Sequence, residues 1–203
     1  FFMRAINYKN DQFKIKEPFQ GLFTQGMVCH ETYKDLNGNW LSPEEVDTNN
    51  GKEFFKRENP NQKVNVGPSE SMSKSKKNTI DPEKIINSYG ADSVRLFIIS
   101  DSPPEKDVQW SEQGMNASYK FIQKLWDLHL KVKSKINDKN NSDIDIEITK
   151  FTHLLVDKIN NNLDKFNYNV IVANMYETYN FLIKKINMPL NGEKLKENYI
   201  KIL

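Results

Sequence analysis

The sequence predicts an α/β fold in its first half, followed by an all-α second half. Short runs of β-forming residues, separated by glycine, proline and asparagine, occur before residue 80. After residue 110, apolar residues recur every three or four positions, which is the pattern of amphipathic helices. The 203 residues are 37% hydrophobic and 11% aromatic, so the chain is too apolar to be disordered and can form one core or two small ones.

The first half is expected to contain a strand, a hairpin and a loop. Residues 22–28 are rich in β-formers and are interrupted by Gly26, which favours a buried strand with a close backbone approach. Asn37-Gly38 tolerates the positive φ angles of a tight turn and predicts a small β-hairpin. Glycine, proline and polar residues dominate 42–70, so we expect a loop-rich insertion with short strands at most, such as residues 63–66.

Two short helices are predicted next. Asp81 suits an N-cap, Pro82 suits the first helical position, and Gly90 ends the helix. A second helix is expected over residues 91–100. The two prolines of residues 101–104 disfavour helical geometry in the residues before them, so we expect the chain to leave this helix in an extended conformation.

A helical bundle is predicted for the C-terminal third. A long amphipathic helix starts at Ser111, and a polar break over residues 137–147 separates it from two further helical stretches, 148–163 and 170–186. Because Trp126 falls on the apolar stripe, we expect it to pack in the core rather than to stack on a nucleic-acid base. The stripe comprises Met115, Tyr119, Ile122, Trp126 and Leu130, and it is broadened by Phe121, Leu125, Leu128 and Val132.

Composition excludes several classes of protein. No run approaches the roughly 18 apolar residues that a membrane-spanning helix needs. The net charge of +2 is too small to indicate a nucleic-acid partner by itself. The single cysteine, Cys29, cannot form an internal disulfide or a cysteine-based zinc site, which fits a reducing cytoplasm. The isolated residues His30, His129 and His153 are each expected to be structural or exposed.

Both ends of the chain resemble cut ends. Phe1 is not an initiator methionine and begins no charged leader, and an apolar helical pattern is still running at residues 199–203. We therefore expect a piece of a longer protein.

The segment most informative about chemistry is residues 69–78, Ser-Glu-Ser-Met-Ser-Lys-Ser-Lys-Lys-Asn. Three ammonium groups attract a polyanion, while serine hydroxyls, backbone N–H groups and the following helix N-terminus supply directional contacts. This combination favours a triphosphate ligand. A solvated surface loop is the alternative, because runs of charged residues are usually exposed. A Walker loop is excluded, since Gly-x-x-x-x-Gly-Lys-Ser/Thr occurs nowhere.

This segment also resembles a family signature. Met72-Ser73-Lys74-Ser75 matches four of the five positions of the KMSKS signature of class I aminoacyl-tRNA synthetases. Stretches 71–82 and 89–97 are similar to those that the leucine, isoleucine, valine and methionine enzymes share. The resemblance covers nearly the whole chain, most strongly from Glu17 to Trp126. Particular resemblance to the bacterial leucine enzymes is carried by residues 17–19, 22–28, 37–40 and 102–110.

The resemblance implies that the chain is the C-terminal remnant of a Rossmann-type catalytic domain joined to a truncated anticodon-binding helical bundle. Its implied parts are the end of the catalytic core at 1–30, a small β-hairpin and loop insertion at 31–68, the KMSKS loop and following helices at 69–110, and the bundle at 111–203.

The resemblance also implies an ATP site. Lys74 is the catalytic candidate, which would neutralise the β- and γ-phosphates while the leucine carboxylate attacks the α-phosphorus to give leucyl-adenylate and pyrophosphate. Mg²⁺ would be bound by the triphosphate and not by a protein metal site. Core packing is the alternative for Met27 and Val28. The implied nucleotide-binding residues are Met27, Val28, Met72, Ser73, Lys74 and Ser75.

Two departures from the family pattern bear on activity. Ser71 stands where the signature has its first lysine, and the sequence leaves open whether Lys76 or Lys77 replaces that charge or meets the tRNA backbone. No His-x-Gly-His element, the other half of the catalytic signature, occurs in the chain. We therefore expect it to supply the triphosphate-binding loop and to be inactive alone in adenylation and proofreading.

Contacts with tRNA are implied for Lys76, Lys77, Arg95 and Lys124. Residues 119–136 carry five lysines against one aspartate, so one helix face could meet phosphates. In the alternative interpretation, a carboxylate pairs with Arg95 to anchor the two short helices, and the lysines only solvate the surface. The implied partners are tRNA(Leu), ATP and leucine, in a monomeric cytoplasmic parent enzyme without membrane contact.

Other functions compete with this assignment. A valine, isoleucine or methionine enzyme has similar signatures, and a non-catalytic RNA-binding helical module would account for residues 111–203. Ser71 and Lys74 also fit the Ser-x-x-Lys of penicillin-recognising hydrolases, in which the lysine activates a serine nucleophile. The companion motifs Ser-Asp-Asn and Lys-Thr-Gly do not occur in the sequence, which counts against a hydrolase.

Overall fold

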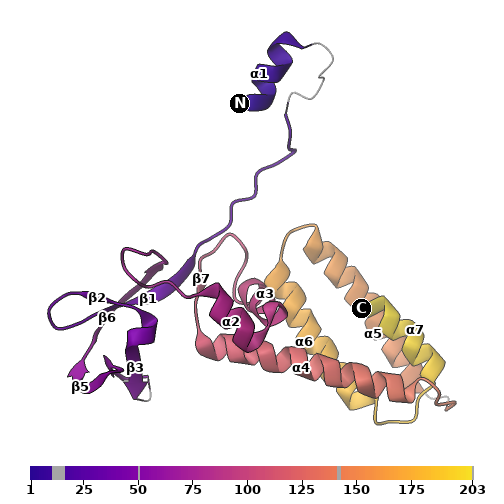
Figure 1. The fold of residues 1–203 in the computed structure, drawn as a ribbon. Coiled ribbons are helices and arrows are strands. Elements are labelled where there is room, and N and C mark those ends of the chain that lie inside the picture. The colour runs from indigo at the N-terminus through magenta and orange to yellow at the C-terminus, as the bar shows by residue number, and fades with distance from the viewer. Residues whose placement is uncertain (11–16, 50, 141–142, 203) are drawn as a thin grey trace.

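The computed structural model describes residues 1–10, 17–49, 51–140 and 143–202. A β part and a helical part lie next to each other, and helix α1 (Phe2–Lys9) stands apart from both, at the end of an extended segment (Figure 1). No helix within these ranges is long and apolar enough to cross a membrane. The segment singled out by the sequence connects the β part to the first helix of the helical part.

The β part contains two sheets. Its strands are β1 (Val28–Lys34), β2 (Trp40–Leu41), β3 (Val46–Asn49), β4 (Glu53–Lys56), β5 (Asn59–Lys63), β6 (Asn65–Ser71) and β7 (Val108–Gln109), with a 3₁₀ turn at Pro43–Glu45. In the first sheet, β1 pairs antiparallel with β2 and β6 and parallel with β7. The second sheet has the order β3-β4-β5. Tyr33 and Leu41 pack with Val46 and Val64 in a small apolar core.

The predicted hairpin is present, whereas the predicted loop-rich insertion is mostly strand. Gly38, in the turn between β1 and β2, has a φ of +84°, as the Asn37-Gly38 pair indicated. Residues 42–70 form β3, β4, β5 and most of β6, so the expectation of a loop-rich segment is wrong, although β3, β4 and β5 are short. Most side chains of these strands are exposed, so the strands lack the apolar alternation by which a half-buried strand is recognised.

The buried strand predicted at residues 22–28 is wrong except at its last residue, where β1 begins. Leu22 is 90% exposed. The segment bonds to the loop before β7: the Gly26 amide donates to the Pro104 carbonyl over 2.9 Å. The close backbone approach expected at Gly26 is confirmed, since a Cβ there would clash with the carbonyl of Lys106.

Both predicted short helices are confirmed as α2 (Pro82–Tyr89) and α3 (Ala91–Ser100). The Asp81 carboxylate accepts a hydrogen bond from the Glu83 amide over 3.0 Å, and Gly90 between the helices has a φ of +81°. The exit from α3 is a turn rather than a simple extended segment, because the Lys106 amide donates to the Pro103 carbonyl over 2.9 Å.

The helical part is completed by α4 (Glu112–Lys135), α5 (Asp143–Leu163), α6 (Tyr168–Lys185) and α7 (Gly192–Ile202). Helix α3 packs against α4 and α6, while α5 packs against α6 and α7 (Figure 1). The helices predicted after Ser111 are thus present, and α7 contains the apolar pattern noted near residue 199. Their largest shared core consists of Leu128, Val132, Ile148, Leu182, Ile186, Leu190 and Leu195.

The core position predicted for Trp126 is wrong. Its side chain is 65% exposed and stacks on His129, with 5.7 Å between the ring centroids. Leu130 is exposed as well. The buried face lies on the broadened side of the predicted stripe, where Phe121, Leu128 and Val132 are buried. It also includes Ser118, which hydropathy does not mark. The buried residues of α4 are Met115, Ser118, Phe121, Leu128 and Val132.

We expect Asp35 to stabilise the hairpin only while its carboxylate is ionised. The carboxylate accepts hydrogen bonds from the amides of Asn37 and Asn39, each over 2.9 Å, and the bonds with Asn39 are the main reason that the pKa of Asp35 lies below its usual range. This stabilisation is therefore complete above about pH 4 and is lost as the pH falls through the pKa of the folded state. In urea unfolding, Asp35→Ala should be less stable than the unchanged chain near neutral pH, by a difference that shrinks in acid.

The control for this prediction is Glu53→Ala, which removes an exposed carboxylate from β4. Its effect on the free energy of unfolding should be small across the same pH range. A stability loss in Asp35→Ala that does not change with pH would contradict the prediction.

Candidate functional site

Residues 72–78, which we call the lysine loop, follow β6 and lead toward α2. Met72 donates its amide hydrogen to the Val28 carbonyl over 3.2 Å, so the loop starts against the beginning of β1. Residues 74–77 form a turn in which the Lys77 amide donates to the Lys74 carbonyl over 3.2 Å. Lys77 has a φ of +55°, a left-handed conformation that residues with a side chain seldom adopt.

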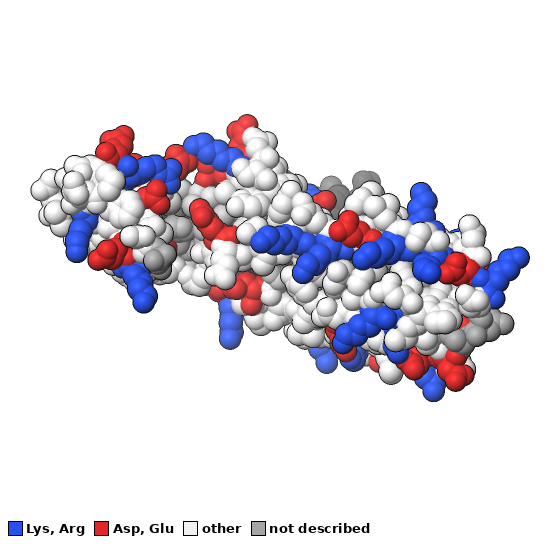
Figure 2. Space-filling view, turned by 90° about the horizontal axis from the view of Figure 1, so that it is seen from below, with Lys and Arg blue, Asp and Glu red and all other residues white. Residues whose placement is uncertain are grey.

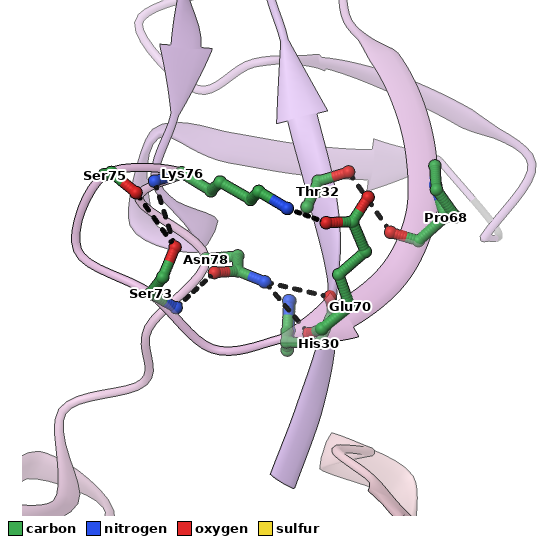
Figure 3. Close-up of polar contacts among 8 residues, drawn as sticks. All are labelled: His30, Thr32, Pro68, Glu70, Ser73, Ser75, Lys76 and Asn78. Carbon is green, nitrogen blue, oxygen red and sulfur yellow. Dashed lines mark hydrogen bonds and ion pairs between the residues drawn. The ribbon is translucent and has the colours of Figure 1, made fainter. Parts of the chain in front are cut away.

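Asn78 connects the lysine loop to the sheet (Figure 3). Its Oδ1 accepts a hydrogen bond from the Ser73 amide over 2.8 Å, and its Nδ2 donates to the carbonyls of His30 and Glu70 over 3.2 and 3.1 Å. Sequence reasoning missed this residue, because an asparagine at the end of a polar run is typical of exposed turns. No signal in the Lys/Ser pattern distinguishes this asparagine as buried.

Ser73 and Ser75 face each other across the turn (Figure 3). Their Oγ atoms lie 3.2 Å apart, and Ser73 Oγ also accepts a hydrogen bond from the Lys76 amide over 3.3 Å. Ser75 is exposed and Ser73 is half-buried. The structure thus brings the two predicted hydroxyl groups together, and each hydroxyl has both donor and acceptor capacity for a phosphate oxygen.

The three lysines of the lysine loop differ in their partners. Lys76 forms an ion pair with Glu70, and Lys77 Nζ lies 3.9 Å from Glu45 Oε2. Lys74 is exposed and has no ion-pair partner among the residues that the structure describes. Lys74 is therefore the loop lysine whose charge no neighbouring carboxylate offsets, which suits it to bind an anion from solution.

Met27 and Val28 lie beside the start of the lysine loop, and the carbonyl of Val28 contacts Met72 directly. Met27 is 57% exposed and so does not pack in a core formed by this chain, whereas Val28 is half-buried. Asp107 accepts a hydrogen bond from the Met27 amide over 2.8 Å. Sequence reasoning missed Asp107 because it is 80 positions away. Burial, with Asp107 as the second cause, raises the pKa of the Cys29 thiol.

The remaining predicted residues lie at the edge of the lysine loop or on the helices. Ser71 is the exposed last residue of β6, opposite Cys29 of β1. Arg95 of α3 forms an ion pair with Asp92 of the same helix over 3.6 Å. The prediction that an ion pair of Arg95 joins α2 to α3 is therefore wrong. Lys124 is exposed on α4. The structure does not bring Arg95 or Lys124 into the lysine loop.

The metal-ligating residue types are scattered in the structure. Within the described residues, no group of three or more His, Cys, Asp and Glu side chains could hold a metal ion. His129 stacks on Trp126, His153 is exposed, and His30 contacts the Tyr33 ring edge-on.

Comparisons with known proteins connect this geometry to a family. A family model described as tRNA synthetases class I (I, L, M and V) matches residues 64–111, a range that includes the lysine loop, α2 and α3. A leucine–tRNA ligase of Rickettsia typhi is 45% identical over 187 residues, which are 92% of this chain and 22% of that protein. A leucine–tRNA ligase of Wolbachia pipientis is 43% identical over 206 residues, which cover 100% of this chain and 24% of the relative.

A solved structure has a similar fold. It is a LeuRS from Agrobacterium radiobacter K84 in a ternary complex with tRNA and LeuAMS, and it superposes with a TM-score of 0.67 over 97% of this chain and 21% of its own. Its sequence identity of 18% limits this comparison to the fold. The matched sequence relatives extend well beyond the region that the chain spans. By its sequence, the chain belongs to the class I tRNA synthetase family and corresponds to about a fifth of the length of a leucine–tRNA ligase.

Proposed function

We propose that the chain is part of a leucine–tRNA ligase, a monomeric cytoplasmic enzyme that activates leucine with ATP and transfers it to tRNA(Leu). Relatives of that name match nearly the whole chain at 43 and 45% identity. Within the chain, the observation that carries the proposal is Lys74, an exposed lysine without a carboxylate partner beside two serine hydroxyls. This arrangement suits the triphosphate of ATP.

In this proposal the chain divides into four parts. Residues 1–30 end a Rossmann-type catalytic domain, 31–68 form a small β insertion, 69–110 contain the lysine loop and the short helices, and 111–203 belong to an anticodon-binding bundle. The last boundary precedes α4. The first two boundaries fall inside β1 and β6, which pair with each other, so the first three parts share one sheet.

The proposed reaction places the charge of Lys74 where negative charge accumulates. When the leucine carboxylate attacks the α-phosphorus of ATP, leucyl-adenylate forms and pyrophosphate leaves with the negative charge. The Lys74 ammonium offsets that charge, and the hydroxyls of Ser73 and Ser75 donate hydrogen bonds to phosphate oxygens. Met27, Val28 and Met72 border the adenine, with Val28 and Met72 joined by a backbone hydrogen bond. Mg²⁺ bound to the triphosphate would neutralise part of its charge.

The chain supplies one half of the active site in this proposal. A His-x-Gly-His element is absent from its sequence, and the leucine pocket is assigned to other parts of the ligase. The isolated chain is therefore expected not to form leucyl-adenylate.

Replacing Lys74 should slow adenylate formation far more than it weakens ATP binding. In the full-length ligase, Lys74→Ala is expected to lower the rate of ATP–pyrophosphate exchange about a hundredfold, since one preorganised charge contact contributes roughly 3 kcal/mol to transition-state stabilisation. The matched control is Lys63→Ala, which removes an exposed lysine of β5 outside the lysine loop. Equal exchange rates in the two variants would refute the role of Lys74.

Another amino-acid specificity within the family is the first alternative. The matched relatives are named leucine ligases, which favours leucine over valine, isoleucine or methionine. Exchange measured with each of these four amino acids in turn distinguishes them, and preference for any one other than leucine would replace the proposed substrate.

RNA binding by the helical part is the second candidate function. Figure 2 shows Lys and Arg side chains in a band along one side of the molecule, interrupted by acidic residues. Lys135 pairs with Asp138 over 3.1 Å, whereas Lys124 has no ion-pair partner in the described ranges. We propose that the lysines of α4 contact the tRNA backbone, and that Arg95, Lys76 and Lys77 add separate contacts. The lysines of α4 are Lys120, Lys124, Lys131, Lys133 and Lys135.

Binding of tRNA to the chain should depend steeply on salt. A contact between Lys124 and a phosphate releases about one counterion, so Lys124→Ala is expected to reduce the slope of log affinity against log salt by about one. Filter binding over a series of salt concentrations measures this slope, and Lys63→Ala again serves as the control. Affinity that is insensitive to salt, or no binding at any concentration, would exclude this face as a tRNA contact.

A further inference from the structure

The side chain of Asn78 is the most completely buried polar group near the lysine loop, with a relative exposure of 0%. We propose that Asn78 is a positioning residue that determines where Lys74 lies, by fixing the lysine loop to β1 and β6 at once. This inference rests on the proposed role of Lys74. It assigns no direct contact between Asn78 and the substrate.

All three hydrogen bonds of the Asn78 side chain are made with backbone groups. The carboxamide oxygen accepts from the Ser73 amide, and the two N–H groups of Nδ2 have one carbonyl each, those of His30 and Glu70. An exposed asparagine of a turn would exchange such bonds with water. A buried one that satisfies three backbone groups fixes their relative positions, because losing any of these bonds leaves a buried polar group unpaired.

The two carbonyls that accept hydrogen bonds from the Asn78 side chain lie next to an irregular point of the sheet. His30 and Glu70 are opposite each other in the pairing of β1 with β6, and the register of that pairing shifts between His30 and Thr32. A bulge of this kind leaves backbone groups without ladder partners. Asn78 thus bridges β1 and β6 beside this irregularity, and it does so from the far end of the lysine loop.

The contact with Ser73 transmits this anchoring to Lys74. Ser73 immediately precedes Lys74, and its Oγ accepts a hydrogen bond from the Lys76 amide on the other side of the turn. The bond from the Ser73 amide to Asn78 therefore closes residues 73–78 into a ring whose base is tied to two strands (Figure 3). Lys74 projects from this ring.

The other attachments of the ring are weaker. The pairs of Lys76 with Glu70 and of Lys77 with Glu45 join partly exposed or exposed side chains, and pairs of that type contribute little because water competes for both charges. The remaining backbone attachment, from Met72 to Val28, lies outside the ring. Asn78 is therefore the contact that decides the position of the ring.

The test combines Asn78→Ala with Lys74→Ala in the full-length ligase, measured by ATP–pyrophosphate exchange. Asn78→Ala should lower kcat about tenfold or more and change the KM for ATP by less than about twofold, because Lys74 acts on charge that develops in the transition state. In the Asn78→Ala background, Lys74→Ala should lower kcat much less than in the unchanged ligase. A displaced Lys74 ammonium stabilises the transition state only weakly, so its removal changes the rate little.

The matched control is Thr32→Val, which removes another buried side-chain bond of the same sheet. Thr32 is buried and its Oγ1 donates to the Pro68 carbonyl over 3.2 Å, a bond that involves no residue of the lysine loop (Figure 3). This variant should lose stability and keep its kcat. A kcat in Asn78→Ala no lower than in Thr32→Val, or effects of Asn78→Ala and Lys74→Ala that simply multiply, would overturn the inference.

A second variant and a second measurement keep the test independent of folding and of the proposed function. If Asn78→Ala does not fold, Asn78→Asp carries the same comparison, because it keeps the volume and the acceptor for the Ser73 amide but loses both donors. Amide hydrogen exchange in the 203-residue chain should show faster exchange at Ser73 in the Asn78 variants than in Thr32→Val.

The two measurements separate the possible failures. An exchange reaction that is insensitive to Lys74→Ala refutes the proposed role of Lys74, while unchanged protection of the Ser73 amide refutes the anchoring by Asn78. Lost protection at Ser73 together with a kcat equal to that of Thr32→Val overturns the positioning role and leaves Lys74 as the catalytic candidate.

Discussion

The pairing of β1 with β6 is the interaction on which the rest of this structure depends. It places the end of β6 against the beginning of β1, so the lysine loop starts beside Val28. At its other end, the loop is bonded to the carbonyl of His30 through Asn78. The same strand β1 holds the β2 hairpin on one side and pairs with β7, which leads to the long helix α4. Displacing β1 would therefore move the lysine loop, the adjoining Met27 segment and the attachment of the helical part together.

The distribution of charge in the lysine loop follows from this arrangement. β6 carries Glu70 beside the loop, and the 3₁₀ turn before β3 brings Glu45 near it, so two of the three lysines meet a carboxylate of the β part. The third lysine, Lys74, projects from the turn toward solvent. A sequence of three lysines with similar chemistry thus becomes a loop with two attached cations and one available to a ligand, and this difference arises from the fold alone.

The features with local causes could be predicted from the sequence. The hairpin at Gly38 and the helix that begins after Asp81 depend on residues within a few positions of each other, and both are present. Periodicity predicted the presence of α4 but misplaced Trp126, because a helix face is determined by what packs against it. The loop composition indicated phosphate chemistry, whereas the contacts of Asn78 and Asp107 join residues far apart in the chain, and no local pattern marks them.

The left-handed backbone of Lys77 limits which sequences this loop can accept. A side chain at a positive φ crowds its own carbonyl group, and branching at Cβ increases that crowding, while glycine is free of it and asparagine tolerates it. Natural variation at position 77 should therefore favour glycine, asparagine and unbranched residues and should exclude valine, isoleucine and threonine. The geometry of the turn would then restrict substitution at this position over evolutionary time, in addition to any requirement for a positive charge.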